Sequence, residues 1–135
     1  MLVTNGLTWK PHTHSGARPD ELTKYMRGLF DINVIANIHL FNLFLPLILK
    51  GHAKKVIAIS SGMADPAFVK DYDIAVGSLY ATSKAALNMI VAKFSAQYKQ
   101  DDVLFLALCP GMVDVGHYDN GTTIPACSED WRFVC

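Results

Sequence analysis

The sequence has no excess of positive or of negative charge. Lys and Arg together number 12, Asp and Glu also number 12, and the formal net charge is therefore zero. A balanced chain has no overall field that would attract nucleic acid or an anionic membrane surface. It also has little electrostatic protection against self-association. We therefore expect neither nucleic acid nor a membrane as a partner.

Cysteine is scarce, and its spacing forms no motif. The three cysteines are Cys109, Cys127 and Cys135, and no two of them have the C-x-x-C spacing. This argues against a disulfide framework or a zinc site. His12 and His14 stand in a predicted loop without further ligands, so we interpret them as surface residues and predict no metal site. The first residues also lack the pattern of a signal peptide, and the expected location is cytoplasmic.

One apolar run, residues 32–49, raises the question of a membrane span. Its polar members are Asn33, Asn37, His39, Asn42 and Pro46. Polar groups of this kind are unfavourable in lipid. A buried amphipathic helix therefore explains the run better than a membrane span.

Apolar residues make up 51% of the 135 residues and charged residues 18%, which suits one folded domain. Hydrophobic periodicity predicts strands alternating with helices, and that order indicates a parallel sheet with right-handed crossovers. The predicted elements are a strand at 1–4, a helix from 21 to about 50 that Gly51 ends, a strand at 54–61, a loop with a short helical turn at 62–78, a helix at 80–100 and a strand at 103–108.

The later strands are continuous apolar runs, which is typical of strands buried on both faces. Beyond Asn33 the first helix is so apolar that we expect it to be covered on most of its circumference. In parallel sheets, ligands lie beyond the carboxyl ends of the strands. The segments at those ends are Asn5-Gly6, Ser60-Ser61-Gly62 and Pro110-Gly111.

Tyr80 and Lys84 stand four residues apart, so they share one face of the predicted helix. A phenol has a pKa of about 10, and a nearby ammonium favours the phenolate. Such a phenol can donate a proton to a developing alkoxide or accept one from an alcohol. The Ser61 hydroxyl, at a strand end, is placed to hold the substrate oxygen. Each feature by itself is also typical of a solvated helix face or a plain turn.

Five segments, which follow one another along the chain in the family's order, resemble the short-chain dehydrogenase/reductase family. YATSK at 80–84 is similar to the Y-x-x-x-K signature, and VIAISS at 56–61 resembles the strand that delivers the catalytic serine. DINV at 31–34 resembles the segment with the helix asparagine. VTNG at 3–6 resembles, imperfectly, the N-A-G turn, and CPGMV at 109–113 resembles the P-G-x-V turn.

This resemblance implies an α/β, partial Rossmann-like (doubly wound) fold with three parallel strands and long helices. Residues 1–118 would be the C-terminal catalytic half of that domain, and 119–135 an irregular tail. The implied reaction is hydride transfer between NAD(P)(H) and a carbonyl or secondary alcohol of a small metabolite.

The resemblance also implies a role for each site residue. Tyr80 would be the general acid/base, Lys84 would lower its pKa and hydrogen-bond the nicotinamide ribose, and Ser61 would orient the substrate oxygen. Asn33 would hold a proton-relay water through a kinked helix. Ser61 is preferred to Ser60 because it matches the second serine of the family's pair. The residues that would line NAD or NADP are Asn5, Gly6, Tyr80, Lys84, Pro110, Gly111 and Val113.

The sequence departs from the family pattern at several points. No Gly-rich turn for a pyrophosphate is present, and the chain begins at what would be the fourth strand, so we expect residues 1–4 to form an open sheet edge. Ser61 and Tyr80 are 19 residues apart, longer than is usual, which predicts an insertion within 63–78. Asn5-Gly6 lacks the alanine of N-A-G, and Val115 stands where the family often has threonine.

Three hypotheses follow from this comparison of patterns. The first is that the chain is an oxidoreductase. The second is that it is a truncated, inactive remnant or an interaction protein, unable to bind cofactor alone. The third is that it is a half-enzyme that a partner chain completes. If the chain forms a homo-oligomer, we expect the two long helices to be the contact surface.

Overall fold

Three short strands lie side by side in one parallel sheet. They are β1 (Leu2–Thr4), β2 (Lys55–Ile59) and β3 (Leu104–Leu108), in the order β1-β2-β3. Ile57 is in register with Val3 on one side and with Leu106 on the other. The computed structural model describes residues 1–4 and 19–111. Within these ranges the parallel α/β arrangement agrees with the predicted fold class.

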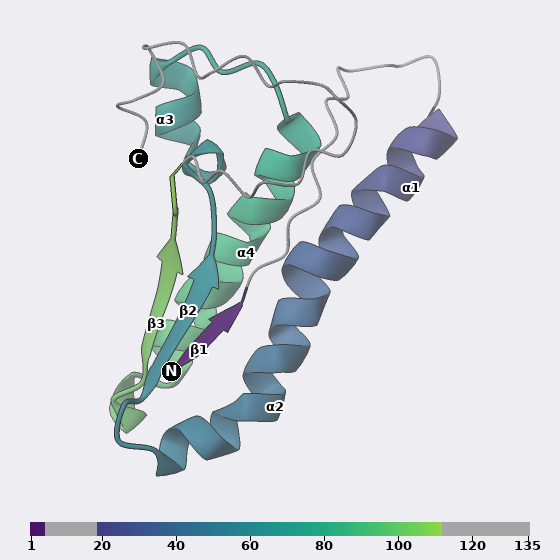
Figure 1. Cartoon of the computed structure of the whole chain (residues 1–135). Helices are drawn as coiled ribbons and strands as arrows, with labels where there is room; N and C mark the ends of the chain where they lie inside the picture. The colour runs from purple at the N-terminus through teal and green to yellow at the C-terminus, as the bar shows by residue number, and fades with distance from the viewer. Residues whose placement is uncertain (5–18, 112–135) are drawn as a thin grey trace, which may run out of the picture.

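The first helical segment is one continuous rod with a π-helical turn in its middle (Figure 1). It comprises α1 (Pro19–Phe30), the π-turn (Asp31–Ile35) and α2 (Ala36–Lys50). Acidic side chains in the first turn of α1 oppose the positive end of the helix dipole. Gly51 ends α2 in an extended conformation with φ −82°, so this predicted cap does not depend on a left-handed glycine.

The second long helix, α4 (Ser78–Gln97), begins directly after Gly77. Gly77 has φ 71°, a left-handed conformation that favours glycine. The segment between β2 and α4 contains a 3-10 turn (Gly62–Ala64) and the short helix α3 (Pro66–Asp71), where the sequence predicted a loop with a helical turn. A second 3-10 turn, Lys99–Asp101, joins α4 to β3.

Both long helices cover the same face of the sheet, and the core lies between them and the strands. Phe41 from α2 and Leu87 from α4 belong to one buried cluster with Val56 and Phe105 from the strands. The Phe41 ring meets Phe94 and Phe105 edge-to-face, with ring centroids 5.3 and 5.7 Å apart. Edge-to-face contacts of this kind stabilise aromatic clusters beyond simple burial. The other buried members of the cluster are Leu45, Ala58, Val91 and Val103.

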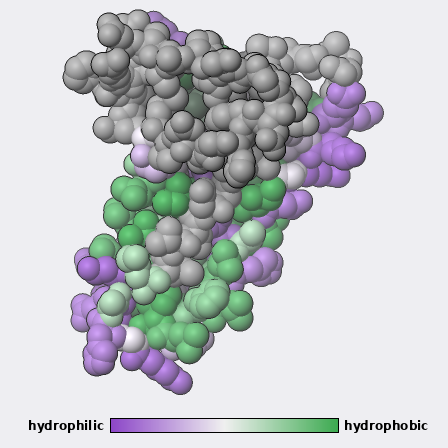
Figure 2. All heavy atoms as spheres, in the orientation of Figure 1, coloured by the Kyte–Doolittle hydropathy of each residue, from purple (hydrophilic) through white to green (hydrophobic). Residues whose placement is uncertain are grey.

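The opposite face of the sheet is bare in the described part of the chain. Along β3, Phe105 is buried while Leu104, Leu106 and Leu108 are 51%, 43% and 43% exposed. Figure 2 shows apolar surface in the lower part of this view, where the strands face the reader in Figure 1. The expectation that these strands are buried on both faces is therefore wrong here. Helices cover only one face of the sheet, so burial alternates along β2 and β3.

The long rod is buried along one stripe rather than around most of its circumference, so that expectation also needs correction. Phe41 and Leu45 face the core, whereas Leu43 and Leu47 are 69% and 64% exposed. By length and composition, the rod Pro19–Lys50 is apolar enough to cross a membrane. Core helices pass the same test. The stripe packed on the sheet agrees with the predicted amphipathic helix.

We predict that Phe41→Ala lowers the free energy of unfolding by about 3–5 kcal/mol, because it removes the centre of the aromatic cluster and leaves a cavity. Urea unfolding followed by circular dichroism measures this change. Lys93→Ala, at an exposed position of α4, is the control and should stay within about 0.5 kcal/mol of the parent. Equal losses in the two variants would contradict the location of the core.

Candidate active site

The polar residues of the predicted site meet where the carboxyl end of β2 approaches the first turns of α4 and the π-turn. Ser60 and Ser61 follow β2 directly, and Tyr80 and Lys84 lie in the first two turns of α4. Asn33 lies in the π-turn and is fully buried. The parallel topology thus brings together residues that lie up to 51 positions apart, between Asn33 and Lys84. This is the edge of the sheet at which ligands bind in such folds.

Tyr80 and Ser61 form the first contact of the site. The Tyr80 side chain is only 8% exposed, and this burial raises its pKa because the charged phenolate is poorly solvated. A hydrogen bond with the Ser61 side chain lowers the pKa in part, and the nearby Cys109 raises it further. The Ser61 oxygen also accepts the Met63 backbone N–H at 3.2 Å. The Ser61 hydroxyl is therefore held between the Tyr80 phenol and the start of the 3-10 turn.

Lys84 is fully buried, and no acidic side chain in the described ranges forms an ion pair with it. Its Nζ donates to the Ile59 carbonyl oxygen at 2.8 Å, and lies 5.7 Å from the centre of the Tyr80 ring. Burial lowers the Lys84 pKa to about 8, because the ammonium loses hydration. The idea that Lys84 lowers the Tyr80 pKa stays a prediction. In the structure as it stands, burial dominates and the Tyr80 pKa is raised.

Asn33 joins the π-turn to α4. Its Nδ2 donates to Ser83 Oγ at 2.9 Å, and the Ser83 hydroxyl donates to the Tyr80 backbone carbonyl at 2.8 Å. The Asn33 Oδ1 atom is buried without a partner among the described residues. The side chain is thus fixed against α4, and a relay water at Asn33 stays a prediction.

The two serines at the end of β2 have different partners. Ser60 Oγ donates to Asn88 Oδ1 at 2.5 Å, which turns Ser60 toward the middle of α4. Ser61 faces Tyr80 instead. The geometry thus separates a serine bonded to Asn88 from a serine bonded to Tyr80.

The remaining predicted cofactor residues are only partly described. Pro110 and Gly111 follow β3, and Gly111 has φ 78°, which a residue with a side chain rarely adopts. This bend lies next to the site, since the Gly62 N–H donates to Cys109 Sγ at 3.2 Å. Asn5, Gly6 and Val113 lie outside the described residues.

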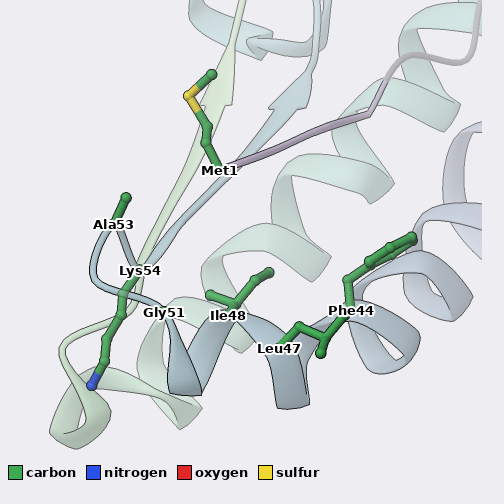
Figure 3. A pocket seen from close by; sticks show the side chains of 7 residues that line it. All are labelled: Met1, Phe44, Leu47, Ile48, Gly51, Ala53 and Lys54. Atoms are coloured by element: carbon green, nitrogen blue, oxygen red, sulfur yellow. The ribbon is translucent and has the colours of Figure 1, made fainter.

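Two pockets in the described structure do not enclose the reacting hydroxyls. One, of about 270 Å³, lies at the opposite end of the sheet, between the start of β1 and the end of α2 (Figure 3). The other, of about 260 Å³, lies between the 63–78 segment and α4, and includes Ala81, Thr82 and Ala85. These three residues lie on a different side of α4 from Tyr80 and Lys84. The residues that line the first pocket are Met1, Phe44, Leu47, Ile48, Gly51, Ala53 and Lys54.

Three residues of the site were not singled out from the sequence: Asn37, Ser83 and Asn88. Asn37 had a detectable signal, because it repeats Asn33 four residues later on an otherwise apolar face. Buried polar residues at such positions are rarely without a hydrogen-bonding role. Ser83 and Asn88 carried no comparable signal, since serine and asparagine are frequent on solvated faces.

Comparison with known proteins agrees with this geometry. Residues 1–123 match the family described as short chain dehydrogenase. The chain belongs to the short-chain dehydrogenase/reductase family, and it is therefore related to oxidoreductases.

Two fungal relatives are especially similar. The chain is 57% identical over 125 residues to the short-chain dehydrogenase/reductase iacC of Pestalotiopsis fici, covering 88% of this chain and 46% of the relative. It is 53% identical over 107 residues to the short chain dehydrogenase virK of Hypocrea virens, covering 79% and 40%. The chain thus spans less than half the length of these relatives.

Solved structures match at the level of the fold. The Sniffer protein of Caenorhabditis elegans, described as a carbonyl reductase, matches with a TM-score of 0.69 and 24% identity, over 84% of this chain and 51% of that one. A short-chain dehydrogenase of Streptomyces avermitilis matches with a TM-score of 0.68 and 22% identity, over 84% and 38%. The described α/β unit is therefore part of a Rossmann-like fold.

We predict that Lys84 makes the stability of the fold depend on pH. Its pKa in the folded state, about 8, lies below the ordinary 10.5. Between these values the unfolded chain binds a proton that the folded chain does not, so the free energy of unfolding rises with pH. Urea unfolding from pH 7.5 to 9.5 measures the slope.

Lys84→Met should make the free energy of unfolding less dependent on pH between 7.5 and 9.5, because the titrating group is removed. Lys93→Met, at an exposed position on the same helix, should keep the parent slope. Identical slopes for the parent and Lys84→Met would show that Lys84 does not titrate in this range.

Proposed function

We propose that this chain carries the proton-transfer part of an NAD(P)-dependent oxidoreductase, with Tyr80 as the acid/base. The observation that supports this is the contact of a buried phenol with a serine hydroxyl beside a buried ammonium. Family membership adds the reaction type, which is hydride transfer between a nicotinamide and a carbonyl or secondary alcohol of a small metabolite.

The nicotinamide end of the cofactor fits the described residues. The Lys84 ammonium has three N–H donors and uses one on Ile59, so two remain for ribose hydroxyls. The bend at Gly111 leaves backbone where a side chain would otherwise stand. A pyrophosphate site has no counterpart in the described ranges, where no Gly-rich turn opens a helix. NAD(P)(H), when bound, supplies or accepts the hydride.

The protein's own groups handle the proton and orient the substrate. In carbonyl reduction, Ser61 donates a hydrogen bond to the carbonyl oxygen, and Tyr80 transfers its phenolic proton to that oxygen as the alcohol forms. The raised pKa keeps Tyr80 protonated at neutral pH, which suits a general acid. The resulting phenolate lies beside Lys84, whose positive charge stabilises it. Alcohol oxidation needs the phenolate first and is expected to require a higher pH.

Tyr80→Phe should lower the turnover of any carbonyl substrate by at least about a hundredfold while leaving the fold intact, because the transferable proton is lost. Oxidation of NADPH or NADH at 340 nm measures turnover, and circular dichroism checks the fold. Tyr72→Phe is the matched control, since Tyr72 is 58% exposed and away from the site. Parent-like turnover in Tyr80→Phe would refute the assigned role.

The competing proposal is a non-catalytic remnant or half-enzyme, because no Gly-rich turn opens a helix in the described ranges. Titration with NADH and NADPH, followed by nicotinamide fluorescence, separates the two. Saturable binding supports the oxidoreductase. No binding at millimolar cofactor supports the remnant, and binding only after addition of a complementary chain supports the half-enzyme.

We also propose that two copies associate through the long helices. The exposed apolar side chains of the rod lie outside the packed stripe, and Met89 on α4 is also 60% exposed. The zero net charge offers no repulsion between copies. The exposed apolar side chains of the rod include Ile32, Ile35, Leu43, Phe44 and Leu47.

Sedimentation velocity should show a dimer for the parent chain and a monomer for the double variant Leu43→Asp, Leu47→Asp, because charges at an apolar interface remain unpaired. Leu106→Asp, on the bare sheet face, should remain dimeric. A monomeric parent chain, or dissociation by Leu106→Asp alone, would reject the helix interface.

A further inference from the structure

Asn37 is a buried amide on the core-facing side of the long rod. It shares this side with Asn33, Phe41 and Leu45, each four residues from the next, and it is only 3% exposed. Its Oδ1 atom is buried without a partner among the described residues. A buried amide is unfavourable unless its hydrogen bonds compensate, so a specific role for the donor group is expected.

The π-turn supplies the carbonyl oxygens to which this donor group binds. The Ala36 N–H bonds to the Asp31 carbonyl five residues back, rather than four as in a regular α-helix. Where the helix returns to four-residue bonding, one backbone carbonyl is skipped and receives no backbone N–H. Asn37 Nδ2 donates to the Asn33 carbonyl at 2.9 Å and to the Ile32 carbonyl at 3.3 Å. The side chain thus supplies a donor to the carbonyls where the register changes.

The π-turn in turn connects to the reacting residues. Asn33 Nδ2 donates to Ser83 Oγ, and Ser83 donates to the Tyr80 carbonyl, with Asn33 and Ser83 both fully buried. Ser83 immediately precedes Lys84 in the chain. A continuous series of short hydrogen bonds therefore runs from Asn37 to the backbone that carries the phenol and the ammonium.

We propose that Asn37 is a positioning residue: its carboxamide holds the π-turn in the register that fixes Asn33 against Ser83, and thereby holds Tyr80 and Lys84 in place. The inference rests on the proposed function of Tyr80 and Lys84, but Asn37 itself touches no reacting group.

Three variants isolate the hydrogen bond. Asn37→Ala removes the donor. Asn37→Ser restores a hydrogen-bond donor, because a serine hydroxyl can donate to the carbonyl four residues back. Asn42→Ala is the matched control. Asn42 makes the same bond to the Ile38 carbonyl at 2.9 Å, but from an exposed position in regular helix.

Two readouts are measured on the chain alone. Amide hydrogen exchange at residues 31–41 should accelerate by about tenfold or more in Asn37→Ala, because a buried carbonyl loses its donor. The Lys84 titration, followed by NMR of ¹³Cε-labelled lysine, should move from near pH 8 toward 10.5 as water reaches the ammonium. Asn37→Ser should recover part of both changes, and Asn42→Ala should show neither.

The Lys84 titration is the decisive readout, because a merely structural role would not move it. Faster exchange in Asn37→Ala with an unchanged Lys84 midpoint would overturn the proposal, as would the absence of both effects. If Asn37→Ala does not fold, Ser83→Ala takes its place. It should shift the Lys84 midpoint while exchange at 31–41 stays near the parent rate, and an unchanged midpoint would again overturn the proposal.

Neither readout needs cofactor or turnover, so failure here is distinct from failure of the proposed function. If Asn37→Ala shifts the Lys84 midpoint but the parent chain binds no nicotinamide, Asn37 positions the site as proposed and the site itself is inactive.

Discussion

The hydrogen bond from the buried Lys84 ammonium to the Ile59 carbonyl is the interaction on which the site depends. It joins the second turn of α4 to the last residue of β2, so that Tyr80 and Ser61 meet at the sheet's carboxyl edge. In the described structure no carboxylate neutralises this ammonium, and its burial is therefore unfavourable for folding. A position that destabilises the charged form of lysine, yet keeps an ammonium beside a phenol, suits chemistry better than packing.

Around this bond lies a small polar cluster inside an otherwise apolar layer. Asn33, Asn37 and Ser83 are nearly or completely buried, yet each donates to a defined oxygen. The cluster depends on the π-turn, because one extra residue in the turn directs Asn33 toward α4 and changes the bonding register of the carbonyls that Asn37 reaches. A regular α-helix at Asp31–Ile35 would satisfy its own carbonyls and leave Asn37 without this role. Irregular backbone and buried amides thus support each other.

Much of the fold could be predicted from the sequence, because its signals are local. Alternation of strands and helices indicated the parallel sheet, and the four-residue spacing of Tyr80 and Lys84 put them on one face of α4. What the sequence did not show depends on neighbours. Apolar runs such as 103–108 look buried on both faces whether or not a second layer exists, so the exposure of Leu106 was not foreseen. The separate roles of Ser60 and Ser61 were inferable only from family resemblance, since adjacent serines have identical local propensities.

Among the described residues, the bare sheet face and the outer edges of β1 and β3, which pair with no further strand, contrast with the well-bonded site. Contacts that build the site come from 33–111, across the helices and the strand ends, and none requires a second layer on the exposed leucines. Tyr80, Ser61 and Lys84 are therefore held in place independently of the surface where apolar area remains uncovered. An unpaired strand edge and an uncovered face reduce the burial available to offset chain entropy. Because the contacts of the site do not include these surfaces, a change at the exposed leucines or at a strand edge is not expected to disturb the arrangement of Tyr80, Ser61 and Lys84.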